Sequence, residues 1–384
     1  MTAAAIPDAR AYRDPFGACL ADERRELDNA GFAAAVRAAA TTFADAGLGA
    51  GDVLAIALPN RVEFVTSLFA AWRLGAAVTP VDPAVTGPRA RQQIDDAGAT
   101  LIVADDTARR KLRGVDPPMI PVDAVSDPDR PDVPVPVSST PHTLALLIYG
   151  TGCAGRPGVM LDHANVGATA QRISAWFGMD RATRGLLVRP LGHLGTIMVN
   201  VVAPLLAGGS AHIAEPGDED GTKDVVERAR PTYLCAVPDV YARLVSGPVC
   251  PSIGRDLRYV ISGGSAMPGD LIWEFEQRYG VPVVEAYGTA ECTAYCTANP
   301  VFGLRKPRTV GLPLPDVDIG VVDEDGGLLP SGVAGEVVVR GPNVMRGYLG
   351  RPRESARTLR GGWLHSGDTG LFDQDGYLML VDRR

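Results

Sequence analysis

Short apolar runs alternate with longer helix-compatible stretches through most of the chain, and this alternation restricts the folds that the chain can adopt. The apolar runs have the length and composition of strands, and the stretches between them have the periodicity of helices. Parallel strands need long crossover connections, so strands that alternate with helices indicate parallel βαβ units. The expected strands cover residues 53–58, 77–81, 101–104, 144–148, 186–188, 211–214, 233–237 and 257–262.

Capping residues mark where two of the helices should begin. Asn29 is a suitable N-cap for the helix that precedes the first strand. Asn60 and Glu63 have the spacing of a capping box, so a helix should start there. The helix that Asn29 caps should cover residues 32–43, and further helices are expected over residues 89–97 and 193–206.

From Asp316 onward the chain changes to short β runs separated by Asp-Gly and Gly-Asp turns. This pattern is typical of an antiparallel, barrel-like unit. We therefore expect an α/β protein in which two α/β subdomains with mainly parallel sheets pack as a layered sandwich, beside a smaller β-barrel-like subdomain. The paired subdomains would occupy residues 1–315 and the β-rich one residues 316–384.

The composition narrows the class of protein. Lys+Arg number 37 against 45 Asp+Glu, for a formal net charge of −8, which argues against a nucleic-acid partner. The six cysteines are scattered without metal-ligand spacing, as expected of reduced cysteines in a cytoplasmic protein. The N-terminus lacks the regions of a signal peptide, and the most apolar window, 196–211, is too short for a membrane span. The only lysines are Lys111, Lys223 and Lys306.

A glycine-rich loop follows the apolar run at residues 144–148. Gly150, Gly152 and Gly155 let the backbone approach a ligand closely, and successive N–H groups in such a loop form a nest for anions. As G-x-G-x-x-G it would bind a dinucleotide, but a strand-like triplet follows where that motif needs a helix. As a Walker loop it has Arg156 and Pro157 where lysine and a hydroxyl residue are required.

The same stretch resembles the phosphate loop of the adenylate-forming superfamily of acyl-CoA synthetases, adenylation domains and luciferases. That loop reads roughly Tyr-Thr-Ser-Gly-Thr-Thr-Gly-x-Pro-Lys-Gly-Val-Met-x-x-His. The residues that match it in order are Tyr149, Thr151, Gly152, Gly155, Pro157, Gly158, Val159, Met160 and His163. Other motifs that resemble those of the superfamily follow in its order at residues 263–268, 287–291, 335–336, 340–348, 362–368 and 382–383.

The resemblance implies the large N-terminal domain of an acyl-CoA synthetase, which holds ATP or AMP as an acyl-adenylate and uses CoA and Mg²⁺. Tyr287 would stack on adenine, Asp368 would bind both ribose hydroxyls, and Glu291 would hold Mg²⁺. The implied catalytic residues are His193, Glu291 and Arg383. The implied nucleotide-binding residues are Thr151, Gly152, Cys153, Gly155, Gly264, Ser265, Ala266, Glu285, Ala286, Tyr287, Gly288, Thr289, Asp368 and Arg383. The implied acyl-pocket residues are His193, Val237, Gly263 and Gly288.

Three departures from the superfamily pattern fall on the handling of the triphosphate. No lysine stands between Pro157 and Gly158, two loop threonines are replaced by Cys153 and Ala154, and Ala290 replaces the threonine before the metal-binding glutamate. We therefore hypothesise that the chain binds an acyl-adenylate but forms it poorly from ATP. A separate adenylating enzyme would supply the adenylate, and this chain would pass its acyl group to CoA or another thiol carrier.

Three alternatives remain open at this point. The chain could be a complete ATP-dependent acyl-CoA ligase whose loop tolerates the changes. It could also be an NAD(P)-binding oxidoreductase, on the glycine spacing alone, or a catalytically dead adenylate-binding protein. Members of the superfamily continue beyond a hinge that Asp382 and Arg383 resemble into a small C-terminal lid domain, which is absent from this chain, and we expect the sequence to be truncated there.

Overall fold

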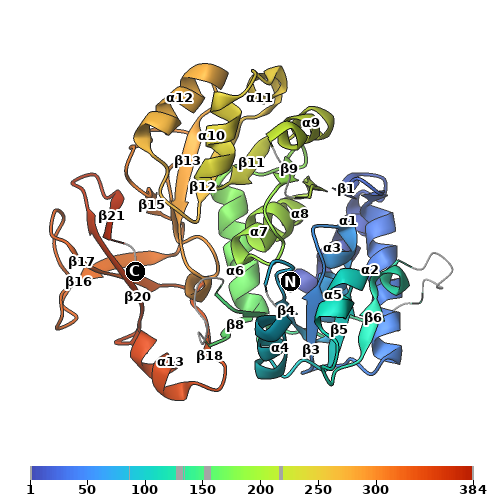
Figure 1. Cartoon of the computed structure of the whole chain (residues 1–384). Helices are drawn as coiled ribbons and strands as arrows, with labels where there is room; N and C mark the ends of the chain where they lie inside the picture. Colours follow the sequence, from blue (N-terminus) through green and yellow to red (C-terminus); the bar gives the residue numbers. More distant parts are fainter. Residues whose placement is uncertain are drawn as a thin grey trace.

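The computed structural model describes residues 2–85, 87–126, 133, 135–150, 157–215 and 219–382. These residues form three sheets, with nine, seven and five strands. Figure 1 shows the N-terminal part in blue and cyan on the right, the central part in green and yellow above it, and the C-terminal part in orange and red on the left.

The seven-stranded sheet has the strand order β18-β8-β7-β4-β3-β5-β6. Its strands pair in parallel from β7 through β6, whereas β8 and β18 add to one edge as antiparallel strands. The strands are β3 (Val53–Ala57), β4 (Ala77–Pro80), β5 (Leu101–Ala104), β6 (Met119–Pro121), β7 (Leu144–Ile148), β8 (Val159–Asp162) and β18 (Gly347–Tyr348). The helices of this region are α2 (Asn29–Asp45), α3 (Val62–Leu74), α4 (Gly87–Asp96), α5 (Asp106–Lys111) and the 3-10 turn η2 (Val122–Val125).

The nine-stranded sheet has the strand order β15-β14-β13-β12-β11-β9-β10-β1-β2. It is parallel from β13 through β1 and antiparallel at both edges. Its strands are β1 (Ala18–Ala21), β2 (Glu26–Asp28), β9 (Arg184–Leu187), β10 (Ser210–Ile213), β11 (Tyr233–Ala236), β12 (Tyr259–Gly263), β13 (Val283–Tyr287), β14 (Thr297–Ala298) and β15 (Leu312–Pro313). Its helical segments are η1 (Ala3–Ala5), α1 (Ile6–Arg13), α6 (His163–Trp176), α7 (Leu194–Thr196), η3 (Ile197–Val202), α8 (Ala203–Ala207), α9 (Glu219–Ala229), α10 (Pro238–Ser246), α11 (Pro251–Asp256), α12 (Gly269–Tyr279) and η4 (Ala290–Cys292).

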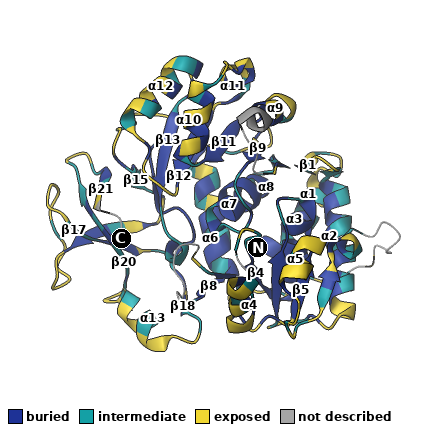
Figure 2. Cartoon of the chain, in the orientation of Figure 1, coloured by how far each residue is buried: buried dark blue, intermediate teal, exposed yellow. Residues whose placement is uncertain are grey.

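The two large sheets share one apolar core. On β11, Tyr233 and Cys235 join this core together with residues of α2, α3, α6 and α8, whereas Leu234 and Ala236 pack with α9, α10, α11 and α12. The other face of the seven-stranded sheet packs against α4 and α5. The layers are therefore helices, sheet, helices, sheet and helices, and Figure 2 shows that the strands of both sheets are buried. The expected α/β sandwich is confirmed.

The C-terminal sheet is antiparallel, as the turn-rich sequence predicts. It joins β16 (Asp318–Val322), β17 (Gly335–Arg340), β19 (Leu359–Arg360), β20 (Trp363–Phe372) and β21 (Leu378–Asp382), with the helix α13 (Pro352–Thr358) between two of them. The short strand β18 lies between β17 and β19 in the sequence but pairs with β8, so the C-terminal part is hydrogen-bonded to the seven-stranded sheet. The division at residue 316 stays a prediction.

Two expected helix caps are wrong. The N-cap of α2 is Asp28, whose carboxylate accepts from the N–H of Gly31 at 2.7 Å. Asn29 instead accepts from Arg10 Nε at 2.7 Å. α3 begins at Val62 without a side-chain cap, because the Asn60 side chain is bonded to a loop of the other sheet. Both asparagines make tertiary contacts that their local spacing does not reveal.

Two further findings concern the helices. The helix expected over residues 193–206 consists of α7, η3 and α8, and its middle part η3 is π-helical. The Tyr233 hydroxyl donates to the Val199 carbonyl within that π turn at 2.6 Å. None of the helices in the described ranges combines the length and hydropathy that a membrane span requires.

Candidate functional site

Two neighbouring cavities lie where parallel strands of the nine-stranded sheet end, the usual ligand position in open α/β sheets. We call the first, of about 310 Å³, the His193 cavity; it is lined by Ile148, Tyr149, Gly150, Arg189, Gly192, His193, Leu194, Gly195, Gly264, Gly288, Thr289, Ala290, Ala294 and Tyr295. We call the second, of about 420 Å³, the Tyr287 cavity; it is lined by Ser262, Ser265, Ala266, Met267, Glu285, Ala286, Tyr287, Arg308, Thr309, Val310, Leu380 and Val381. Most of the site residues expected from the sequence and described by the structure therefore converge.

Two positions that line the His193 cavity require glycine, one because its neighbours leave no space for a side chain and the other because of its backbone conformation. A Cβ at Gly288 would lie 1.6 Å from the carbonyl oxygen of Ala294, so no side chain fits there. Gly264 follows β12 with a φ of +98°, a left-handed conformation that glycine adopts without strain. Both glycines line the His193 cavity, and their chain neighbours Ser265 and Tyr287 line the Tyr287 cavity.

Tyr287 and Asp368 lie far apart in the sequence but form a hydrogen bond. The Tyr287 hydroxyl, at the end of β13, donates to Asp368 Oδ2 on β20 at 2.7 Å. Tyr287 is 1% exposed and Asp368 6% exposed. Burial raises the pKa of Tyr287, so the phenol stays protonated and donates this bond. The contact joins the C-terminal sheet to the wall of the Tyr287 cavity.

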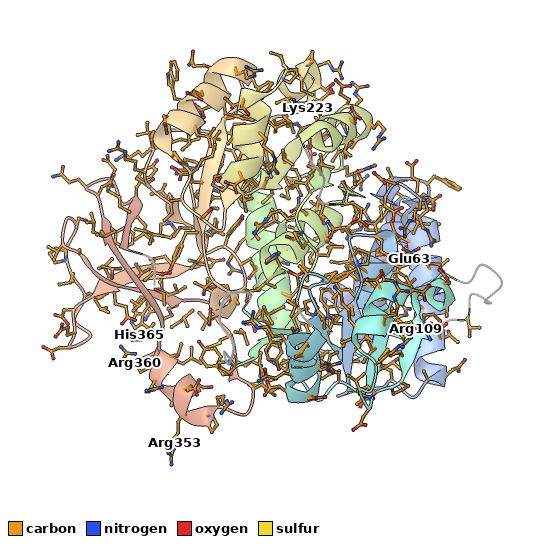
Figure 3. All side chains as sticks on the ribbon, in the orientation of Figure 1. Glu63, Arg109, Lys223, Arg353, Arg360 and His365 are labelled. Atoms are coloured by element: carbon orange, nitrogen blue, oxygen red, sulfur yellow. The ribbon has the colours of Figure 1, made fainter. Side chains whose placement is uncertain are left out.

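Glu336 on β17 holds the irregularly paired stretch of β20 that presents Asp368. Its carboxylate accepts from the N–H of Gly367 at 3.1 Å and lies 2.8 Å from His365 Nδ1. Arg360 Nη2 also donates to it, at 3.3 Å. Figure 3 shows His365 and Arg360 close together at the lower left of the molecule. The motifs at 335–336 and 362–368 thus meet through one carboxylate.

Glu285 lines the Tyr287 cavity and lies on β13, two residues before that strand ends at Tyr287. Burial raises the pKa of Glu285 to about 7, although backbone hydrogen bonds at Met267 and Arg308 oppose the rise. The side chain is therefore divided between its neutral and charged forms near neutral pH. A carboxyl of this kind can both donate and accept hydrogen bonds.

Glu291 lies in η4, directly after the residues that line the His193 cavity. Its Oε1 accepts from the Tyr348 hydroxyl at 3.0 Å, and its backbone carbonyl accepts from the N–H of Met345 at 2.8 Å. Both partners belong to the segment around β18, so this segment positions Glu291. Within the described ranges, no three His, Cys, Asp or Glu side chains form a group that could hold a metal ion.

His193 is the N-cap residue of α7 and lines the cavity named after it. Burial lowers the pKa of His193, the charge of Arg189 lowers it further, and Asp82 opposes both. The imidazole is therefore neutral near pH 7. Gly263 is buried at the end of β12, whereas Val237 is the N-cap residue of α10 and packs against the outer core rather than lining either cavity.

Five of the expected site residues, Thr151, Gly152, Cys153, Gly155 and Arg383, lie outside the described residues. The strands that flank the glycine-rich loop are described: β7 and β8 pair as an antiparallel hairpin, and α6 begins only after β8. A dinucleotide loop leads from a strand directly into a helix. The hairpin therefore agrees with the rejection of that motif.

Sequence reasoning missed several polar residues that line the cavities, among them Arg189, Tyr295 and Arg308. Arg189 could have been found, because it follows a predicted strand end and stands four residues before His193. Tyr295 and Arg308 follow no predicted strand end and match no motif, so no sequence signal could have identified them.

The family model for AMP-binding enzymes matches residues 2–349 of the chain. The chain therefore belongs to the AMP-binding enzyme family.

The relatives of the chain indicate to which group of AMP-binding enzymes it belongs. A feruloyl-CoA synthase of Amycolatopsis sp. is 31% identical over 389 residues, with 98% of this chain and 77% of the relative covered. A 2-succinylbenzoate–CoA ligase of Geobacillus kaustophilus is 29% identical, with 98% of this chain and 76% of the relative covered. ATP-bound MatB from Rhodopseudomonas palustris is similar in structure, with a TM-score of 0.91 at 27% identity over 100% of this chain and 79% of that one. MenE of Bacillus subtilis in complex with AMP has a TM-score of 0.90 at 25% identity over 99% and 78%. The chain is an acid–thiol ligase of the acyl-CoA ligase family.

Proposed function

We propose that this chain binds an acyl-adenylate across the two cavities and transfers its acyl group to the thiol of CoA. Adenine and ribose would occupy the Tyr287 cavity, and the acyl group would enter the His193 cavity. The contact between Tyr287 and Asp368 supports this most directly, because it brings a ring suited to stacking next to a carboxylate suited to a ribose diol. A carboxylate that holds both hydroxyls of the ribose fixes the α-phosphate relative to the acyl group.

The other predicted residues fit this arrangement. Ser265, Ala266 and Glu285 line the side on which adenine would lie. Gly288 leaves room for the phosphate at the edge of the His193 cavity, where backbone N–H groups would stabilise developing negative charge. Neutral His193 would border the carbonyl of the acyl group. Thiol attack on that carbonyl forms the thioester and releases AMP as the leaving group.

We further propose that formation of the adenylate from ATP is weakened. The chain has three lysines, all within its described part, and none lines either cavity. Lys306 pairs with Asp373 at 2.6 Å, Lys111 donates to the Pro83 carbonyl at 2.7 Å, and Lys223 lies on α9 at the top of Figure 3. The triphosphate would therefore meet no lysine in either cavity, where the cationic lining residues are Arg189 and Arg308.

Magnesium would fit only with help from the substrate. In the part of the chain that the structure describes, Glu291 belongs to no group of three His, Cys, Asp or Glu side chains, so Mg²⁺ there would take most of its ligands from phosphate oxygens and water. The five cysteines of the described part are free thiols, which supports a reducing compartment such as the cytoplasm.

The test compares the chain with a variant that has a lysine inserted between Pro157 and Gly158. We expect both proteins to bind AMP and an acyl-sulfamoyl adenosine equally well in calorimetric titrations. The insertion should strengthen ATP binding by about tenfold, since each charge-assisted contact contributes on the order of 1.5 kcal/mol or more. Synthetic acyl-AMP and CoA should give a thioester with the original chain.

The outcomes separate the candidate functions. Brisk carboxylate-dependent exchange of pyrophosphate into ATP by the original chain would reject the weakened adenylation and leave a complete ligase. Adenylate binding without any thioester would leave a binding protein. Failure to bind the acyl-sulfamoyl adenosine would reject the proposed site itself. In the first case, the supply of adenylate by a separate enzyme would also be unnecessary.

A further inference from the structure

Arg189 extends from the loop after β9, and its backbone is held from both sides by one buried residue. Asn60 Nδ2 donates to the Arg189 carbonyl at 2.9 Å, and Asn60 Oδ1 accepts from the N–H of Leu191 at 2.8 Å. Asn60 is itself 5% exposed. The backbone position from which the Arg189 side chain extends is therefore fixed between the two large sheets.

The guanidinium of Arg189 points along the ends of the neighbouring strands. Its Nη2 lies 3.3 Å from the position that a Cβ of Gly264 would take. Its charge opposes the rise that burial causes in the pKa of the Cys235 thiol on β11. The group therefore lies across the ends of β11 and β12, on the wall of the His193 cavity.

No carboxylate neutralises this cation. Among the described residues, no Asp or Glu oxygen lies within 4.0 Å of Arg189, although ion pairs of other half-buried arginines are present. Arg73, for comparison, bonds Asp8 at 2.8 Å. The side-chain hydrogen-bond partner of Arg189 is the Cys235 thiol, and a partly buried cation that has no carboxylate partner costs free energy, which a bound anion recovers. The planar guanidinium fork matches a carboxylate with two parallel hydrogen bonds.

The surroundings of Arg189 are polar and confined. The Tyr295 hydroxyl fills the space beside Gly263, where an added Cβ would lie 2.2 Å from it. Cys235 Sγ is 3.5 Å from the same hydroxyl. The cavity of about 310 Å³ is near the lower end of the roughly 300–1,000 Å³ range of small-molecule sites. A long apolar chain would meet polar groups here, whereas a short acid with a polar end would not.

We propose that Arg189 binds a second carboxylate, at the far end of the acyl group, and thereby selects a short dicarboxylic acid. This rests on the proposed function, because it assumes that the acyl group enters the His193 cavity. The phosphate side of the cavity is formed by Thr289 and Ala290 after β13, and β12 and β11 separate that strand from β9. The backbone of Arg189 thus lies on the β9 side of the cavity, and its guanidinium reaches across the strand ends as far as Gly264, so the end of a short acyl chain would meet it between β9 and β12.

The test measures the affinities of two acyl-sulfamoyl adenosines of equal chain length by calorimetric titration. One carries a succinyl group, which ends in a carboxylate, and the other a butanoyl group, which ends in a methyl. The proteins are the original chain, Arg189→Met and the control Arg184→Met. Arg184 is an exposed residue at the opposite end of the same strand, so its loss removes a similar charge away from the cavities.

The original chain and Arg184→Met should bind the succinyl compound about 10- to 100-fold more tightly than the butanoyl compound, the range expected for a charge-assisted bidentate contact. Arg189→Met should lose this preference and keep its affinity for the butanoyl compound. Arg189→Lys should keep part of the preference, because the charge remains and the fork is lost.

Equal loss of affinity for both compounds in Arg189→Met would overturn the proposal and assign the arginine to the phosphate or to the fold. Equal affinities in the original chain would overturn it as well, while leaving the proposed adenylate site intact. If neither compound binds, the proposed function has failed and the selectivity of Arg189 with it.

Discussion

The buried carboxyl of Glu285 should make the stability of the protein depend on pH near neutrality. Its pKa rises from 4.5 to about 7 on folding because burial disfavours the charged form. A carboxyl whose pKa is raised binds protons more tightly in the folded state. Its stabilising effect is therefore complete below pH 4.5 and is lost as the pH rises through about 7.

The size of this effect follows from the two pKa values. A shift of about 2.5 units corresponds to about 3 kcal/mol of destabilisation once the carboxyl is fully ionised. The side chain is 8% exposed, so little screening by solvent is expected. Glu285→Gln removes the charge and keeps the shape. The variant should therefore be more stable than the original chain by about 3 kcal/mol at pH 8 and by less than about 1 kcal/mol at pH 5.

Denaturant unfolding of both proteins at several pH values between 5 and 8.5 measures this difference. Glu274→Gln is the control, because Glu274 is exposed on α12. It should follow the original chain at every pH. A stability difference between Glu285→Gln and the original chain that stays constant with pH would show that Glu285 does not titrate in this range, and would refute the reasoning.

Two further predictions concern packing and acid stability. Gly288→Ala should destabilise the protein by more than about 3 kcal/mol, because its Cβ would lie 1.6 Å from a backbone carbonyl oxygen. In the control Gly269→Ala, the new Cβ meets nothing within 4 Å, so stability should change by less than about 1 kcal/mol. Similar unfolding midpoints for both variants would contradict this prediction. Burial would raise the pKa of Glu63, but hydrogen bonds from Arg61 and Ser126 outweigh it and lower the pKa to about 2. The stability that Glu63 contributes is thus present above pH 4.5 and lost as the pH falls through about 2. Glu63→Gln should cost about 3 kcal/mol at pH 7 and almost nothing near pH 2, as acid titrations of unfolding would show; an equal cost at both pH values would exclude the ion pairs as its source.

The strands and their layering could be predicted because each central strand is a run of apolar residues buried on both faces. The runs at β3, β5 and β12 are visible without any knowledge of their neighbours. The site roles of Tyr287 and Glu285 were instead implied by the resemblance to the adenylate-forming superfamily, because the strand pattern did not reveal β13. What the pattern supplied was the direction of each strand and the side on which its loops lie.

The features of the structure that could not be predicted from the sequence depend on contacts between residues far apart in the chain. The strand β1 has only four residues, and its partner β10 comes much later in the chain. Asn29 and Asn60 have the local spacing of caps, but stronger partners from other layers take their side chains. An arginine without a carboxylate partner looks like any other arginine until its neighbours are known, so the sequence could not show that Arg189 is uncompensated.

The position of β1 also limits the order in which the protein can assemble during synthesis. Leu20 pairs with Ala211, about 190 residues later, and Arg10 Nη1 donates to the Leu205 carbonyl at 2.7 Å. At ordinary translation speeds the first strand would wait roughly 10 to 40 s for its partner to be made. Until then the edge of β1 that will pair with β10 is open, since the short β2 covers the opposite edge, and we expect the nascent chain to need protection from misassociation through this interval.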